Sequence, residues 1–141
     1  MGLCVATALG LALARPERRV LAMTGDGELL MGIGALAVVG AQAPQNLGIL
    51  VLDNEHFGET GRQPGLTGMR TDLCAIARGV GIEHTLEVTA MDQIDALAEL
   101  MFGTPGPTFA VAKIALTEHP WALPEKDGAV IARRFMTAAT E

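Results

Sequence analysis

The sequence predicts an α/β protein of three layers, in which helices cover both faces of a parallel sheet. Two observations indicate this class. Short apolar runs alternate along the chain with longer runs rich in Ala, Leu and Gly, the order of strands and helices in such proteins. The apolar runs are continuous, as strands buried on both faces require. With 141 residues, half of them hydrophobic and only 4% aromatic, the chain is long enough for one packed domain.

Each element follows from a run of apolar residues and the break after it. Strands are expected at the short apolar runs, over residues 19–24, 47–52, 85–88 and 108–114. Helices are expected over residues 3–14, 28–41, 71–80, 91–102 and 127–139. Pro16 ends the first helix, and Pro44 and Asn46 form a turn after the second. Right-handed crossovers between successive strands then give a parallel sheet.

The composition excludes several classes of protein. A formal net charge of −6 argues against a nucleic-acid or anionic-membrane binder held by general electrostatics. Cys4 and Cys74 are too few for a zinc knuckle or a disulfide framework. The longest uncharged apolar stretch, 29–43, is shorter than the ~18–20 residues of a membrane span, and no leader peptide is visible. We therefore expect a soluble cytoplasmic protein, and a mean hydropathy of +0.35 predicts an oligomer.

Two polar loops follow neighbouring strands of the expected sheet. Residues 25–28 follow the first strand, and residues 53–61 follow the second. Both loops belong at the carboxyl edge of the sheet, where ligands bind in such folds. Together they bring five carboxylates, which repel one another unless a cation or protons intervene. These are Asp26, Glu28, Asp53, Glu55 and Glu59.

The loop residues favour a hard metal ion. Asn54 adds a neutral oxygen, and His56 is the only imidazole in either loop. Oxygen donors of this kind suit Mg²⁺ or Ca²⁺. The helix expected from Glu28 points its N-terminus at the same place, which favours an anion there. The loops therefore predict a metal-bridged phosphate; the alternative is that they are ordinary polar loops at strand ends.

The spacing of these residues resembles a known motif. Gly25-Asp26-Gly27 is followed after 26 residues by Asn54, as in the metal-and-diphosphate motif of thiamine-diphosphate enzymes. Asp53 stands where that family often has a first Asn. The resemblance implies that Asp26 and Asn54 bind Mg²⁺ through side-chain oxygens and that His56 binds it through its backbone carbonyl. It also implies the thiamine-diphosphate-binding fold.

The flanking residues resemble one branch of that family more closely. Residues 1–4, 8–14, 53–64 and 124–135 are similar to the diphosphate-binding subunit of sulfopyruvate and phosphonopyruvate decarboxylases. The resemblance implies that residues 1–141 form a single diphosphate-binding domain. The cofactor-binding residues it implies are Met1, Gly2, Gly25, Asp26, Gly27, Glu28, Asn54, His56, Phe57, Gly58, Glu59 and Thr60.

His56 and Glu59 are the candidate catalytic residues in this reading. Alternatively, His56 lends only its backbone carbonyl to the metal, and Glu59 only solvates the loop. Arg62 and Arg70 are the basic residues close to the motif in the sequence. Either could pair with an acidic substrate, or could simply balance surface charge.

Two departures from the family pattern shape the expected assembly. The strand and helix that precede this region in the family are missing, so the apolar residue that bends the cofactor would be Met1; the alternative is a frayed terminus. The family's catalytic glutamate lies on a pyrimidine-binding domain, for which 141 residues leave no room. The resemblance thus implies a split 2-oxoacid decarboxylase, dependent on thiamine diphosphate and Mg²⁺ and completed by a separate pyrimidine-domain subunit.

Two other functions fit the same residues. An acetolactate-synthase-like carboligase subunit would share every residue named above. A truncated, non-catalytic binding module of the same fold is the alternative from another class. The sequence names neither the 2-oxoacid nor the partner.

Overall fold

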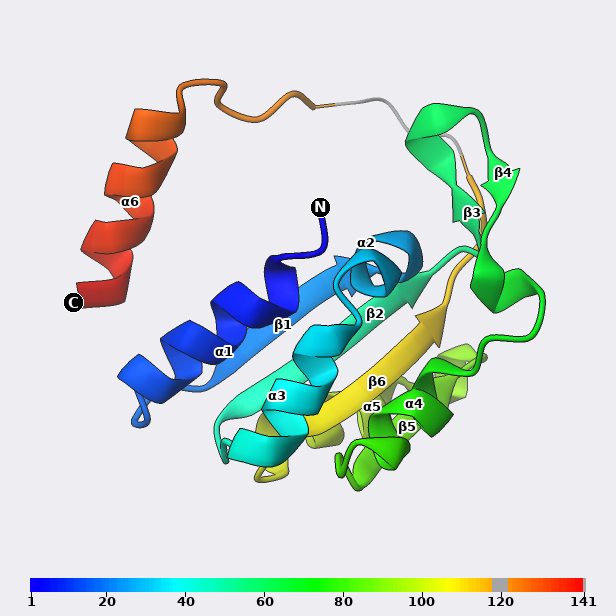
Figure 1. Cartoon of the computed structure of the whole chain (residues 1–141), viewed down its shortest axis with the longest axis horizontal. Coiled ribbons are helices and arrows are strands. Elements are labelled where there is room, and N and C mark those ends of the chain that lie inside the picture. The colour runs from blue at the N-terminus through cyan, green and yellow to red at the C-terminus, as the bar shows by residue number, and fades with distance from the viewer. Residues whose placement is uncertain (118–121, 141) are drawn as a thin grey trace.

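A four-stranded parallel sheet forms the centre of the molecule. The computed structural model describes residues 1–117 and 122–140 (Figure 1). The strand order is β1-β2-β6-β5. Neighbouring strands run parallel, with Thr24 opposite Val51 and Val51 opposite Val111. The strands are β1 (Val20–Gly25), β2 (Leu47–Asp53), β5 (His84–Val88) and β6 (Thr108–Lys113). The predicted strands and their parallel arrangement are confirmed.

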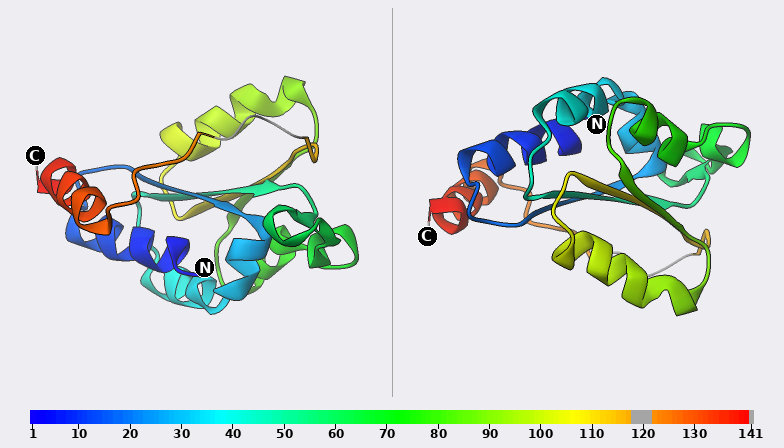
Figure 2. Two further views of the ribbon diagram at one scale, coloured as in Figure 1. Left: turned by 90° about the horizontal axis from the view of Figure 1, so that it is seen from above. Right: turned by 90° about the horizontal axis from the view of Figure 1, so that it is seen from below.

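Helices cover both faces of the sheet, which confirms the three layers (Figure 2). One face carries α1 (Cys4–Ala14), α2 (Asp26–Met31), α3 (Gly34–Gln42) and α4 (Leu73–Gly79). Their apolar side chains pack with Ile49 and Phe109 of the sheet. The opposite face carries α5 (Ile94–Ala98) and the turns on either side of it, where Met101 packs against Leu50 and Val88. The two cores hold the sheet between the layers of helices.

The helix predicted over 28–41 is wrong, because the structure divides it into α2 and α3. The chain leaves α2 at Gly32, whose N–H donates to Leu29, and turns before α3 begins. The backbone of Gly2 packs directly on this turn: a Cβ on Gly32 would lie 1.9 Å from the Gly2 carbonyl oxygen. The break therefore depends on a contact between segments 30 residues apart in the sequence, which helical periodicity does not reveal.

The predicted helix 91–102 is also less regular than expected. It consists of a 3-10 turn (Met91–Gln93), α5 and a π-helical turn (Glu99–Gly103). The guanidinium of Arg19 donates to the carbonyls of Leu100, Met101 and Thr104 at its end. This cation satisfies carbonyl groups that a regular helix end would leave without partners.

The polar stretch after β2 contains two short strands and two 3-10 turns. Strand β3 (His56–Phe57) pairs antiparallel with β4 (Gln63–Pro64), and the turns cover Gly58–Thr60 and Leu66–Gly68. Helix α4 then begins after Asp72, whose carboxylate accepts from the N–H of Ala75 at 2.8 Å. The hairpin holds the second polar loop above the carboxyl ends of the strands.

The last helix, α6 (Gly128–Thr140), lies beside the end of α1 (Figure 1). None of its residues is buried, and Ile131, Phe135 and Met136 are exposed. The guanidinium of Arg18 donates to the carbonyl of Ala138 at 2.8 Å. Over the part of the chain that the structure describes, no helix is both long and apolar enough to cross a membrane.

We expect Gly40→Ala to destabilise the fold by about 1–3 kcal/mol, because a Cβ there would lie 1.8 Å from the backbone oxygen of Val80. Gly10→Ala is the matched control in α1, where a Cβ meets nothing within 4 Å. It should leave stability unchanged or raise it by about 0.5–1 kcal/mol, the usual gain of Ala over Gly in a helix. Urea unfolding measures both values, and equal effects would contradict the packing of α3 on the α4–β5 turn.

Candidate active site

The two polar loops meet at a cavity of about 780 Å³ at the carboxyl edge of the sheet. Every residue that the resemblance implied for the cofactor lines it, with the exception of Gly2. Gly2 lies instead against the end of α2. Four lining residues were not predicted as part of the site: Met31, Leu52, Leu116 and Thr117. Arg62, which the sequence offered as a partner for an acidic substrate, lines the cavity as well. Asp26 and Asn54 line the same cavity because β1 and β2 are adjacent and parallel.

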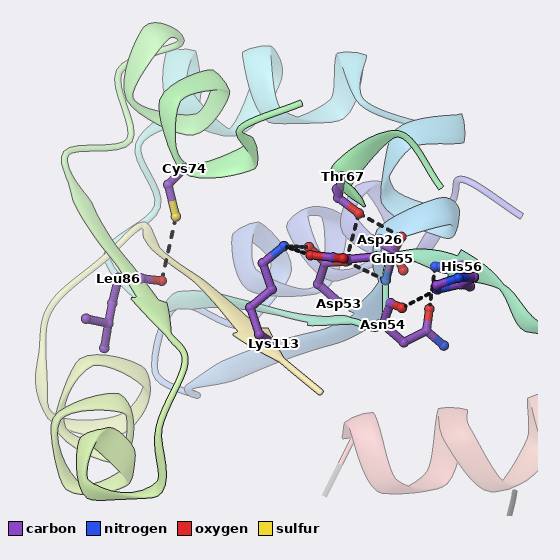
Figure 3. Close-up of polar contacts among 9 residues, drawn as sticks. All are labelled: Asp26, Asp53, Asn54, Glu55, His56, Thr67, Cys74, Leu86 and Lys113. Atoms are coloured by element: carbon purple, nitrogen blue, oxygen red, sulfur yellow. Dashed lines mark hydrogen bonds and ion pairs between the residues drawn. The ribbon is translucent and has the colours of Figure 1, made fainter. Parts of the chain in front are cut away.

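Asp26 is a buried carboxylate at the start of α2, with an exposed fraction of 3%. Its Oδ2 lies 3.1 Å from the hydroxyl of Thr67, which also lies 2.8 Å from Oδ1 of Asp53 (Figure 3). A hydroxyl carries one hydrogen, so it can donate to only one of these carboxylates at a time. Burial raises the pKa of Asp26, and the charge of Asp53 raises it further. A cation beside Asp26 would relieve both effects.

Asp53 is almost completely buried, and Lys113 supplies its countercharge (Figure 3). The Nζ of Lys113 lies 2.8 Å from Oδ2 of Asp53 and 2.7 Å from Oε1 of Glu55. Burial alone would lower the pKa of Lys113, but its hydrogen bonds to the two carboxylates raise it overall. Lys113 is therefore charged at neutral pH, and its single positive charge is shared between two of the five carboxylates.

The backbone between Asn54 and His56 is shaped by local side-chain contacts. Glu55 has a φ of 61°, in the left-handed region that non-glycine residues seldom adopt. Its N–H donates to Asp53 at 2.9 Å, while its carboxylate meets Lys113. The amide oxygen of Asn54 accepts from the N–H of His56 at 3.0 Å and keeps a second lone pair. The Nδ1 of His56 lies 2.8 Å from the Asn54 carbonyl, so the loop itself orients the imidazole.

Glu28 lies in the first turn of α2, but its carboxylate serves a different helix. Its carboxylate reaches the N-terminus of α1, where it accepts from the N–H groups of Leu3 and Cys4, and it also accepts from the hydroxyl of Thr24. Burial would raise the pKa of Glu28, but these hydrogen bonds lower it overall. Among the described residues, Asp26 is then the buried carboxylate of the cavity without a Lys or Arg partner.

Sequence reasoning missed Thr67 and Lys113. Arg62 and Arg70 appeared to be the bases near the motif, yet Lys113 is the base that meets its carboxylates. Arg62 lines the cavity, whereas Arg70 lines a separate cavity of about 290 Å³. Lys113 lies opposite Asp53 in the register of β6 and β2. A correct strand order would have revealed this pair, but local spacing could not.

The donors at the cavity do not form a cluster of acidic and imidazole side chains. In the described ranges, 1–117 and 122–140, no three side chains of His, Cys, Asp or Glu converge as a metal site. The ligand set implied by the resemblance includes only one such side chain, Asp26, together with an amide oxygen and a backbone carbonyl. A metal ion held by these three groups would need further oxygen ligands, supplied by a bound molecule or by water.

Comparison of the sequence with known proteins identifies a family and several relatives. Residues 1–112 match the family described as thiamine pyrophosphate enzyme, C-terminal TPP binding domain. A phosphonopyruvate decarboxylase from Streptomyces viridochromogenes is 40% identical over 99% of this chain and 35% of its own length. Sulfopyruvate decarboxylase subunit beta from Methanocaldococcus jannaschii is 37% identical over 67% of this chain and 50% of its own length. The chain therefore spans between a third and a half of these relatives.

A solved structure supports the fold independently. Transketolase from Campylobacter jejuni superposes with a TM-score of 0.65, covering 80% of this chain and 20% of that one. The two sequences are 18% identical in the superposed region, so the likeness concerns the arrangement of strands and helices alone.

We expect Lys113→Met to destabilise the protein by about 2–3 kcal/mol, because it leaves the Asp53 carboxylate buried without its countercharge. Lys113→Met combined with Asp53→Asn should recover most of this loss, because the amide needs no cation. Arg15→Met is the control; its exposed pair with Glu17 spans 3.7 Å and should contribute less than about 1 kcal/mol. Unfolding by urea at pH 7 provides the comparison, and a double variant as unstable as Lys113→Met would contradict the pairing.

Proposed function

The chain belongs to the thiamine pyrophosphate enzyme family through its C-terminal TPP-binding domain, and from this premise we propose that it is the diphosphate-binding part of a split, Mg²⁺-dependent decarboxylase. Its substrate would be a small acidic 2-oxoacid of the sulfopyruvate or phosphonopyruvate type. The names of its relatives support the reaction class. The residues at the cavity support the cofactor, as set out below.

The donor set at the cavity fits a magnesium ion that bridges to a diphosphate. Asp26 offers a carboxylate that burial and Asp53 make unfavourable as a lone anion. Asn54 offers an amide oxygen with a free lone pair, and His56 offers a backbone carbonyl. These are hard oxygen donors, and Mg²⁺ commonly completes its octahedron with substrate phosphates and water. We propose that these three residues hold the metal and that the backbone of Gly27 and Glu28 faces the diphosphate.

We assign the remaining cavity residues to three roles: forming apolar walls, transferring a proton and binding the substrate. Bound thiamine diphosphate supplies the electron sink for decarboxylation. Leu52 and Phe57 give the cavity apolar walls that exclude water from the reacting carbon. His56 and Glu59 remain our candidates for moving a proton. Arg62 brings a positive charge to the lining and is our candidate for the acidic end of the substrate.

A second subunit is part of the proposal. The Methanocaldococcus relative is named subunit beta, which implies another subunit in that enzyme. Apolar side chains lie exposed beside the present cavity, among them Met1 with 78% and Met31 with 58% of its surface accessible. Such a surface favours an interface. We propose that a pyrimidine-domain subunit covers it, giving a cytoplasmic hetero-oligomer in which Cys4 and Cys74 remain reduced thiols.

One observation supports this proposal more than any other. Asp26 and Asn54, from loops after two adjacent parallel strands, line one cavity. Of the buried carboxylates described there, Asp26 is the one that no Lys or Arg neutralises. These two observations support our proposal that a divalent cation binds at Asp26, next to a cavity that could hold its anionic ligand.

We expect Asp26→Asn to weaken Mg²⁺-dependent binding of thiamine diphosphate by at least about 100-fold, because it removes the charged metal ligand. The fold should remain intact and its stability unchanged or higher, because the substitution removes a desolvated charge beside Asp53. Asp92→Asn, an exposed acid in the 3-10 turn before α5, is the matched control. Calorimetric titration with and without Mg²⁺ measures the affinities, and equal binding by wild type and Asp26→Asn would exclude this ligand assignment.

We also expect the isolated chain to have no decarboxylase activity and to gain it with a pyrimidine-domain partner. The products from sulfopyruvate and phosphonopyruvate identify the reaction. An aldehyde one carbon shorter than the substrate supports the decarboxylase, while a longer carbon skeleton supports an acetolactate-synthase-like carboligase. Turnover by the purified single chain would contradict the split enzyme. Failure to bind the cofactor under any metal condition, even with the partner, would favour a non-catalytic module.

A further inference from the structure

The carboxylate of Glu28 connects the first polar loop to the beginning of α1. Its Oε1 accepts from the N–H of Leu3 at 3.0 Å and from the N–H of Cys4 at 3.2 Å. Its Oε2 accepts from the hydroxyl of Thr24, one residue before the loop begins. Both carboxylate oxygens are therefore engaged by donors of this chain.

Helix α1 has no cap of its own. Leu3 occupies the N-cap position without a side-chain hydrogen bond, and the first turn contains no acidic residue. The unpaired N–H groups at a helix start favour a nearby negative charge. Glu28 provides this charge from α2, so the start of α1 is anchored to a residue directly after Gly25-Asp26-Gly27.

A second contact attaches the same segment to the other end of α2. Gly2, with a φ of 82°, packs so closely on Gly32 that a Cβ on either residue would collide with the backbone of the other. Gly2 itself is not part of the cavity lining, whereas Met1 and Met31 are. The segment 1–4 is thus held at both ends of α2, and Met1 is carried into the cavity wall.

The contacts of Glu28 also explain how an acidic residue can line a cavity that we propose binds a diphosphate. A free carboxylate there would repel a diphosphate. In this chain the N–H groups at the start of α1 and the hydroxyl of Thr24 solvate its charge, which reduces its repulsion of an anion in the cavity.

We propose that Glu28 is a positioning residue for cofactor binding: by holding the start of α1 it fixes Met1 in the cavity wall, and it raises the affinity for thiamine diphosphate without contacting the cofactor through its carboxylate. This inference rests on the proposed function. It separates the role of Glu28 from that of Asp26, which would bind the metal directly.

The test combines hydrogen exchange with cofactor titration on the full chain. Glu28→Ala should increase the exchange rates of the Leu3 and Cys4 amides and weaken thiamine diphosphate binding with Mg²⁺, each by about tenfold. Glu28→Gln keeps an acceptor oxygen but loses the charge, so it should rescue both effects in part. Asp26→Asn should weaken binding without changing exchange at these amides. Glu17→Gln, just beyond the other end of α1, should change neither quantity.

Two further measurements distinguish a general loss of stability from a displacement of the segment 1–4. Gly40→Ala reduces stability away from α1's first turn, so it should leave the affinity of the folded molecules unchanged. If Glu28→Ala does not fold, Glu28→Gln and Thr24→Val provide the same comparison, because Thr24→Val removes the donor to Oε2.

The outcomes distinguish this inference from the proposed function. Wild-type affinity in Glu28→Ala would overturn the positioning role, whether or not amide exchange increases. If Glu28→Ala does not fold, wild-type affinity in both Glu28→Gln and Thr24→Val would overturn it. Faster exchange with unchanged affinity would reduce Glu28 to a helix cap. If the wild type binds no thiamine diphosphate under any metal condition, even with a pyrimidine-domain subunit present, the proposed function fails first, and the positioning role fails with it.

Discussion

The structure depends on how negative charge is balanced at the carboxyl edge of the sheet. Two adjacent parallel strands end in loops that bring five carboxylates to one place. Asp26 and Asp53 are buried, and a buried charge needs a partner. The ammonium of Lys113 lies between Asp53 and Glu55, and the N–H groups at the start of α1 donate to Glu28. Asp26 has no Lys or Arg partner among the described residues, and this imbalance supports the proposal that a divalent cation binds there.

The same contacts connect the second polar loop to the sheet. Asp53 holds the N–H of Glu55 and the ammonium of Lys113, so the left-handed backbone at Glu55 is fixed from two sides. Asn54 and His56 are tied to each other within the same loop. These contacts link the sheet to the second polar loop and orient the side chains of Asp53, Asn54 and His56. Preorganised donors of this kind lower the cost of binding a metal and its phosphate ligand.

Much of this arrangement could be predicted from local sequence. Continuous apolar runs gave the four strands, and the glycines of Gly25-Asp26-Gly27 with Asn54 gave the loops that line the cavity. The features that the sequence did not predict share a different cause. Gly32 ends α2 because Gly2 packs on it, Lys113 meets Asp53 through the strand register, and Glu28 caps a helix 24 residues away. Each depends on a contact between distant segments, which composition and spacing in one sequence do not encode.

The central claim is that Asp26, Asn54 and the carbonyl of His56 hold one metal ion that carries a diphosphate. Anomalous diffraction from crystals grown with thiamine diphosphate and Mn²⁺ in place of Mg²⁺ tests it most directly. We expect a single strong anomalous peak coordinated by these three oxygens and by the diphosphate. A peak at other residues, or a bound diphosphate that reaches the protein without a metal at Asp26, would contradict it.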